Sequence, residues 1–161
     1  MRFYYILFVL VLGHVVIYSQ NQSEKHPLPN DFVWLKNDAG EIVDRLDLSY
    51  YEFLGVPQAW QLTTGKPNVL IGISDAAVDP DQTDFKGKTK VLKSTDSKNG
   101  HGMGVAAIAA AQGDNDFGIP GVCYDCGLVT TNYGNPNLEM LLELADAGAK
   151  VINCSWVSSA G

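Results

Sequence analysis

The sequence has few basic side chains, and this shortage narrows the classes of function open to it. Eleven Lys and Arg residues stand against 18 Asp and Glu residues, which gives a formal net charge of −7 at pH 7. Such a balance argues against binding to nucleic acid or to an anionic membrane surface. The chain also lacks internal repeats and low-complexity segments. Its 161 residues, of which 46% are hydrophobic, indicate a single globular domain.

Long apolar runs are also scarce, and the only extended one lies at the N-terminus. Met1 and Arg2 precede an apolar run over residues 3–18, which His14 interrupts and which a small residue, Ser19, follows. The run is shorter than the roughly 20 residues that a transmembrane helix needs. We therefore predict that residues 1–19 form a cleaved signal peptide rather than an uncleaved anchor. The protein is then secreted or extracytoplasmic, with no stable membrane association after cleavage.

Cysteine is rare, and the number of cysteines is odd. Cys123 and Cys126 form a C-x-x-C pair, whereas Cys154 stands apart. A redox motif or half of a zinc site would fit the pair poorly, because zinc needs further ligands and a redox motif belongs near the start of a βαβ unit. After export, a small structural disulfide or two buried thiols is the simpler interpretation. Cys154 lies in an apolar segment and is expected to be a packed thiol.

The order of apolar segments predicts an α/β fold. Residues 20–49 form an N-terminal link with a possible hairpin, because a turn at 38–40 separates two weakly alternating segments. The elements expected after this link are a short helix (50–60), a strand (69–74), an edge strand (90–93), a helix (101–112), a strand (127–133), an amphipathic helix (138–147) and a buried strand (151–155). Strands that alternate with helices indicate a doubly wound parallel sheet.

Two of these elements place chemically active side chains at one edge of the sheet. The apolar strand at 69–74 leads into Asp75, and the next long helix begins at His101. Ligands in open α/β sheets bind outside the carboxyl ends of the strands, where Asp75 is expected. An aspartate that orients an imidazole makes up two thirds of a serine hydrolase triad. We therefore predict that Asp75 and His101 are catalytic, although a strand-end aspartate and a histidine beside glycine also occur as structural residues.

Five segments in the same order resemble subtilisin-like serine proteases. Residues 75–79 (Asp-Ala-Ala-Val-Asp) resemble the Asp-Thr-Gly-Ile-Asp segment of the family, and residues 99–106 (Asn-Gly-His-Gly-Met-Gly-Val-Ala) resemble its Asn-Gly-His-Gly-Thr-His-Val-Ala segment. The flanking matches are residues 59–65, 118–122 and 151–156. The resemblance implies that residues 50–161 are the N-terminal part of a subtilisin-like peptidase domain, incomplete at its C-terminal side. The nucleophilic serine and the oxyanion-binding asparagine would then lie beyond Gly161.

The resemblance also implies how a substrate and a metal ion would bind. Ser155, Trp156 and Val157 match the strand beside which the family binds a peptide or protein substrate through main-chain hydrogen bonds. Asp84 matches a calcium-binding position of some family members, and Asp114 and Asn115 could add oxygen ligands. A structural calcium ion is thus an expectation, and no cofactor is required for the chemistry.

Three residues depart from the family pattern. Ala77 replaces a glycine, Met103 and Gly104 replace Thr-His, and Val157 replaces a glycine after the substrate strand. None of these changes removes a catalytic group, but Val157 could crowd a bound peptide. Two alternatives to a serine endopeptidase therefore stay open: a non-catalytic protease-like binding or remnant protein, and an unrelated secreted α/β domain with a calcium loop.

Overall fold

A computed structural model describes residues 28–31, 34–36, 42–45, 47–93, 100–132 and 138–157. The proposed signal peptide lies outside these residues. The helices and strands, in chain order, are β1 (Trp34–Lys36), β2 (Ile42–Arg45), α2 (Ser49–Phe53), α3 (Val56–Trp60), β3 (Leu70–Asp75), β4 (Thr89–Lys93), α4 (His101–Ala110), β5 (Gly127–Asn132), α5 (Leu138–Asp146) and β6 (Ala149–Cys154).

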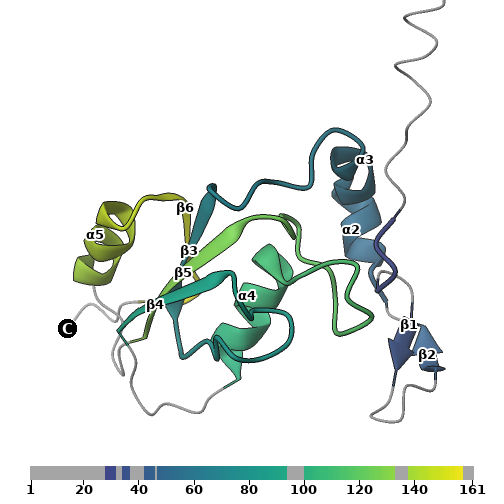
Figure 1. Cartoon of the computed structure of the whole chain (residues 1–161), viewed down its shortest axis with the longest axis horizontal. Helices are drawn as coiled ribbons and strands as arrows, with labels where there is room; N and C mark the ends of the chain where they lie inside the picture. Colours follow the sequence, from purple (N-terminus) through teal and green to yellow (C-terminus); the bar gives the residue numbers. More distant parts are fainter. Residues whose placement is uncertain are drawn as a thin grey trace, which may run out of the picture.

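The centre of the structure is a four-stranded parallel sheet in the order β4-β5-β3-β6 (Figure 1). All three strand pairs are parallel, so the carboxyl ends of the strands share one edge of the sheet. Ile73 and Asp75 share one face of β3 because successive side chains of a strand point to opposite faces. Helix α4 packs on that face, through a core that includes Ile73, Ala106, Ala110 and Leu128. The parallel α/β fold is as predicted.

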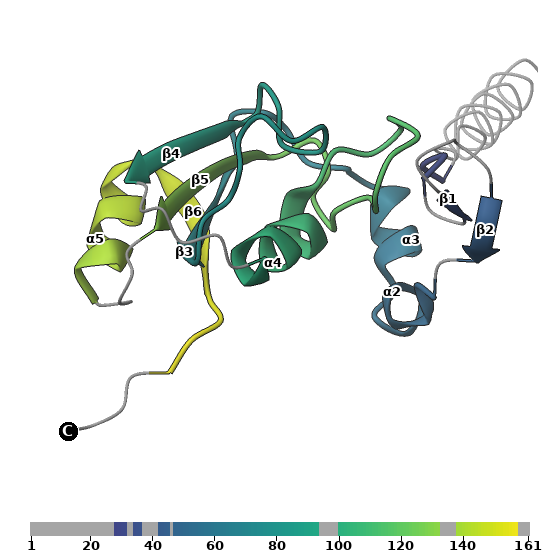
Figure 2. The same ribbon diagram turned by 90° about the horizontal axis from the view of Figure 1, so that it is seen from below.

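Helix α5 covers the other face of the sheet (Figures 1 and 2). Its buried residues are Met140 and Leu144, and Met140 contacts Ser74, the neighbour of Asp75 on β3. Asp75 and Ser74 therefore face different layers. At the same edge of the sheet, the Asp75 carboxylate points toward the α4 layer and the Ser74 hydroxyl points toward the α5 layer.

The N-terminal part forms a smaller layer beside the sheet. β1 and β2 pair antiparallel, as expected for a hairpin in this region. The helix expected at 50–60 is two short helices, because Gly55 between them adopts a left-handed conformation with φ of 73°. Tyr51 and Trp60 anchor this layer: the Tyr51 hydroxyl donates to the Pro120 carbonyl at 2.8 Å, and the Trp60 indole donates to the Val122 carbonyl at 2.9 Å.

The structure corrects the expectation for Cys154 and decides between the two alternatives for Cys123 and Cys126. β6 was expected to be buried, but Val151 is 61% exposed and Cys154 is an exposed free cysteine, not a packed thiol. The reason is that β6 is the outermost strand of the sheet among the described residues, where it pairs with β3 on one side. Cys123 and Cys126 form a disulfide, which selects one of the two alternatives left open for this pair.

Candidate active site

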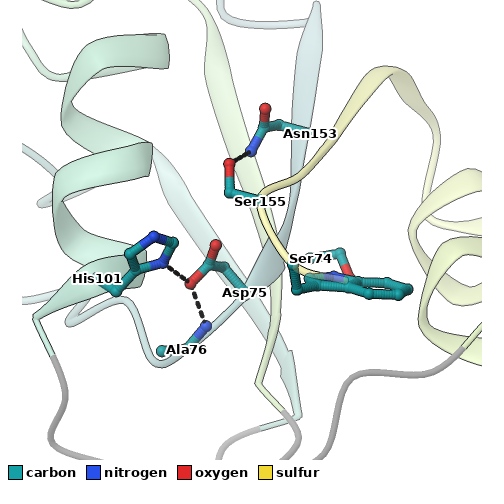
Figure 3. Close-up of polar contacts among 7 residues, drawn as sticks. Ser74, Asp75, Ala76, His101, Asn153 and Ser155 are labelled. Atoms are coloured by element: carbon teal, nitrogen blue, oxygen red, sulfur yellow. Dashed lines mark hydrogen bonds and ion pairs between the residues drawn. The ribbon is translucent and has the colours of Figure 1, made fainter. Parts of the chain in front are cut away.

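The structure brings Asp75 and His101 into direct contact. Asp75 is the last residue of β3, and His101 is the first residue of α4. The distance from His101 Nδ1 to Asp75 Oδ1 is 2.7 Å (Figure 3). The same carboxylate oxygen accepts the backbone N–H of Ala76 at 2.6 Å, which fixes the carboxylate against its own chain. The imidazole is therefore held by a carboxylate that is itself held in place.

The close approach of strand and helix depends on a glycine at the second position of α4. A Cβ atom placed on Gly102 would lie 2.1 Å from the carbonyl oxygen of Ala76, so a side chain does not fit there. The absence of a side chain lets the first turn of α4 approach the turn that follows Asp75. This is why side chains as short as those of Asp75 and His101 can meet.

The two partners differ in their exposure to solvent. The Asp75 side chain is 4% exposed, whereas the His101 side chain is 56% exposed. Since Nδ1 faces Asp75, Nε2 is the ring nitrogen that points away from the carboxylate. A buried carboxylate bonded to Nδ1 of an imidazole is the arrangement that favours the tautomer protonated on Nδ1, in which Nε2 carries the lone pair.

The predicted substrate-binding residues follow β6 at the same edge of the sheet. Ser155 and Val157 are exposed, and Val157 is 94% exposed. The hydroxyl of Ser155 accepts a hydrogen bond from Asn153 Nδ2 at 2.8 Å (Figure 3). Trp156 is half-buried, and its indole Nε1 donates to Ser74 Oγ at 3.0 Å. The local sequence pattern gave no indication of the contacts made by Ser74 and Asn153.

The predicted calcium-binding residues lie together in part. Asp84 is buried, and its Oδ1 accepts from Asn115 Nδ2 at 2.8 Å. Asp114 is exposed, and its carboxylate accepts the backbone N–H of Asn30 at 2.9 Å. Within the described ranges, no group of three or more His, Cys, Asp or Glu side chains is arranged to hold a metal ion.

Asp31 is a second buried carboxylate beside Asp84, and no motif of the sequence marks it as a site residue. Its Oδ1 is buried and has no hydrogen-bond partner within the part of the chain that the structure describes, and burial raises the pKa of its carboxyl group. Burial also raises the pKa of Asp84, and the negative charge of Asp31 adds to that rise. A Cβ atom on Gly118 would lie 2.2 Å from Asp84 Oδ2, so the loop backbone closes over this carboxylate. Both carboxylates accept hydrogen bonds from N–H groups of Asn115, and both supply oxygens of the kind that calcium ions bind.

A parallel α/β fold with an aspartate–histidine pair at the carboxyl edge of its sheet defines a candidate hydrolase of the catalytic-triad class. Residues 66–160 match the subtilase family (peptidase S8), and the chain belongs to that family. It is 32% identical over 114 residues to a thermophilic serine proteinase of Bacillus sp. (strain AK1), a match that spans 60% of this chain and 28% of that protein.

A solved structure supports the subtilisin-like fold. The prenylagaramide maturation protease PagA has a TM-score of 0.51 and 25% identity, over 66% of this chain and 42% of that chain. The chain thus spans less than half of the length of either relative. The region is protease-like and belongs to a family of serine-type peptidases. No helix among the described residues is long and apolar enough to cross a membrane.

Proposed function

We propose that this chain is the N-terminal part of the catalytic domain of a secreted subtilisin-like serine endopeptidase. The observation that carries the proposal is the 2.7 Å contact between His101 Nδ1 and Asp75 Oδ1 at the carboxyl edge of the sheet. In this proposal the nucleophilic serine belongs to a segment outside residues 1–161. Peptides or proteins are the substrates, and the signal peptide directs the protein out of the cytoplasm.

His101 acts as the general base and then as the general acid. Its Nε2 takes the proton from the serine hydroxyl as the serine oxygen attacks the peptide carbonyl carbon, and later returns that proton to the leaving amine. Asp75 holds the neutral imidazole in the correct tautomer and stabilises the imidazolium that forms. The burial of Asp75 supports this role, because a carboxylate away from water interacts more strongly with the positive ring.

Ser155, Trp156 and Val157 are proposed to bind the substrate backbone. They follow β6 at the carboxyl edge of the sheet, and an extended peptide can pair with such a segment through main-chain hydrogen bonds. The exposure of Ser155 and Val157 is consistent with this role. A calcium ion is proposed to bind beside Asp31 and Asp84, with a structural rather than a chemical role.

The test of the proposed function is peptide hydrolysis by the full-length encoded protein. We expect casein cleavage that a serine-reactive fluorophosphonate abolishes, and loss of this cleavage in the His101→Ala variant. The 161-residue chain alone should be neither active nor labelled, since loss of the triad serine costs about a million-fold in turnover in the subtilisin case that provides this value. An encoded protein without a serine that the probe can label would instead support a non-catalytic protease-like protein.

A further inference from the structure

A buried hydroxyl group joins the strand that carries Asp75 to the segment that follows β6. Ser74 is fully buried, and its Oγ accepts a hydrogen bond from Trp156 Nε1 at 3.0 Å across 82 positions of the chain. On its other side the hydroxyl lies 3.9 Å from Met140 Sδ in α5 and can donate to it. The Ser74 hydroxyl is thus used both as acceptor and as donor.

The position of Ser74 excludes it as the nucleophile. It is adjacent to Asp75 on β3, so its side chain points to the opposite face of the sheet, toward α5. His101 lies on the α4 side and contacts Asp75. The Ser74 hydroxyl therefore cannot reach the His101 imidazole, and its role lies in the hydrogen bond that it forms with Trp156.

The group that Ser74 holds belongs to the proposed substrate segment. Trp156 lies between the exposed residues Ser155 and Val157, and it is the half-buried residue of the three. Within β6, Cys154 still pairs in register with Ser74, but no strand flanks this segment on its outer side among the described residues. The hydrogen bond from the Trp156 indole to Ser74 therefore attaches this segment to the sheet, although its neighbours Ser155 and Val157 are exposed.

We propose that Ser74 is a positioning residue, which holds Trp156 and thereby fixes residues 155–157 beside the Asp75–His101 pair before a peptide binds. This inference rests on the proposed function, and it names a part of the substrate site that acts through Trp156 rather than by touching the substrate. Pre-organisation of a binding segment saves the entropy of ordering it on binding. Loss of the hydrogen bond therefore weakens peptide binding and leaves the proton transfers unchanged.

The neighbouring strand supplies a matched control. Thr131 pairs with Ser74 in the register of β5, is buried, and its hydroxyl has no hydrogen-bond partner among the described residues. Thr131→Val removes a buried hydroxyl next to Ser74 without removing a hydrogen bond. Ser74→Ala removes both the hydroxyl and the bond to Trp156.

The kinetic experiment uses the full-length protein. We expect Ser74→Ala to raise KM for a peptide substrate by roughly 3- to 10-fold with kcat nearly unchanged, the size of effect that one hydrogen bond provides. Thr131→Val should leave both constants unchanged. In a Trp156→Phe background, Ser74→Ala should have no further effect on KM, because the donor is already absent. Equal effects of Ser74→Ala in both backgrounds would overturn the proposal.

A second measurement does not depend on activity. In hydrogen-exchange NMR of the same protein, the Trp156 indole N–H, identified by its loss in Trp156→Phe, should be protected. Ser74→Ala should accelerate its exchange at least several-fold, whereas Thr131→Val should not. The indole N–H of Trp60, bonded to Val122, serves as the internal reference. Unchanged exchange in Ser74→Ala refutes the positioning role, whereas an inactive wild-type protein with the expected exchange pattern refutes only the proposed function.

Discussion

Replacing Gly102 with alanine should separate Asp75 from His101. The added Cβ atom would lie 2.1 Å from the Ala76 carbonyl oxygen, whereas real Cβ atoms essentially never approach closer than 3.0 Å. The start of α4 and the turn after β3 must therefore move apart by about 0.9 Å, the difference between these two distances. A displacement of this size lengthens the 2.7 Å bond between His101 and Asp75 beyond hydrogen-bond distance.

The expected loss of activity is large relative to the change in sequence. A misplacement of about 1 Å in a catalytic arrangement can cost on the order of 100-fold in rate, and we expect kcat/KM of the full-length Gly102→Ala variant to fall by about this factor. The forced repacking should also reduce the free energy of unfolding by about 1–3 kcal/mol.

Gly104 provides the matched control on the same helix. A Cβ atom there meets nothing within 4 Å, so Gly104→Ala should leave activity unchanged. It should stabilise the helix by up to about 1 kcal/mol, because alanine is the better helix former. Peptide hydrolysis and thermal unfolding of both variants test the reasoning. If Gly102→Ala matches Gly104→Ala in both assays, the close contact between α4 and β3 does not position the histidine.

Asp75→Asn should lower kcat of the full-length protein by about four orders of magnitude without unfolding it, as the corresponding change does in a serine protease of another fold, and activity near wild type would exclude the triad role. Because burial raises the carboxyl pKa values of Asp31 and Asp84, the folded protein keeps protons on these groups above pH 3.8, where the unfolded chain has lost them. Without calcium, these two groups therefore reduce the free energy of unfolding as pH rises. Added calcium should raise the unfolding temperature most at neutral pH, and a gain that does not grow from pH 4 to 7 would contradict this. Burial lowers the pKa of Lys88 to about 8, so between about pH 8 and 10.5 the unfolded chain binds more protons at this residue than the folded protein does. Lys88 should therefore increase the free energy of unfolding as pH rises through this range. Lys88→Met should remove this contribution, and an unchanged pH dependence of unfolding would argue against the lowered pKa.

Local sequence patterns were sufficient to predict the elements that build the site. The apolar strand before Asp75 and the small-residue helix from His101 both appear in the structure, with bounds shifted by one or two residues. The pattern could not show that Gly55 would divide the first helix, because its left-handed conformation depends on how the two short helices pack. It also could not show that β6 would be the outermost strand among the described residues, since burial depends on which strands flank it.

Contacts between distant parts of the chain account for what sequence reasoning missed at the site. Asp31 lies in the N-terminal link, where the pattern predicts only a hairpin, yet its carboxylate accepts the backbone N–H of Asn115, 84 positions away, at 3.5 Å. Ser74 looks like an ordinary strand residue, and its bond to Trp156 exists only because β3 and β6 are neighbours. Periodicity and motif spacing predict single helices and strands. Contacts between residues that are far apart in the sequence depend on which strands and loops become neighbours in the fold.

Covalent labelling shows whether Asp75 and His101 serve a serine nucleophile. The full-length encoded protein is treated with a serine-reactive fluorophosphonate, and the modified residue is mapped by mass spectrometry in the wild type and in His101→Ala. We expect one labelled serine, C-terminal to residue 161, whose labelling is lost in His101→Ala although the variant remains folded. No labelled serine in the wild type, or labelling that persists without His101, would contradict it.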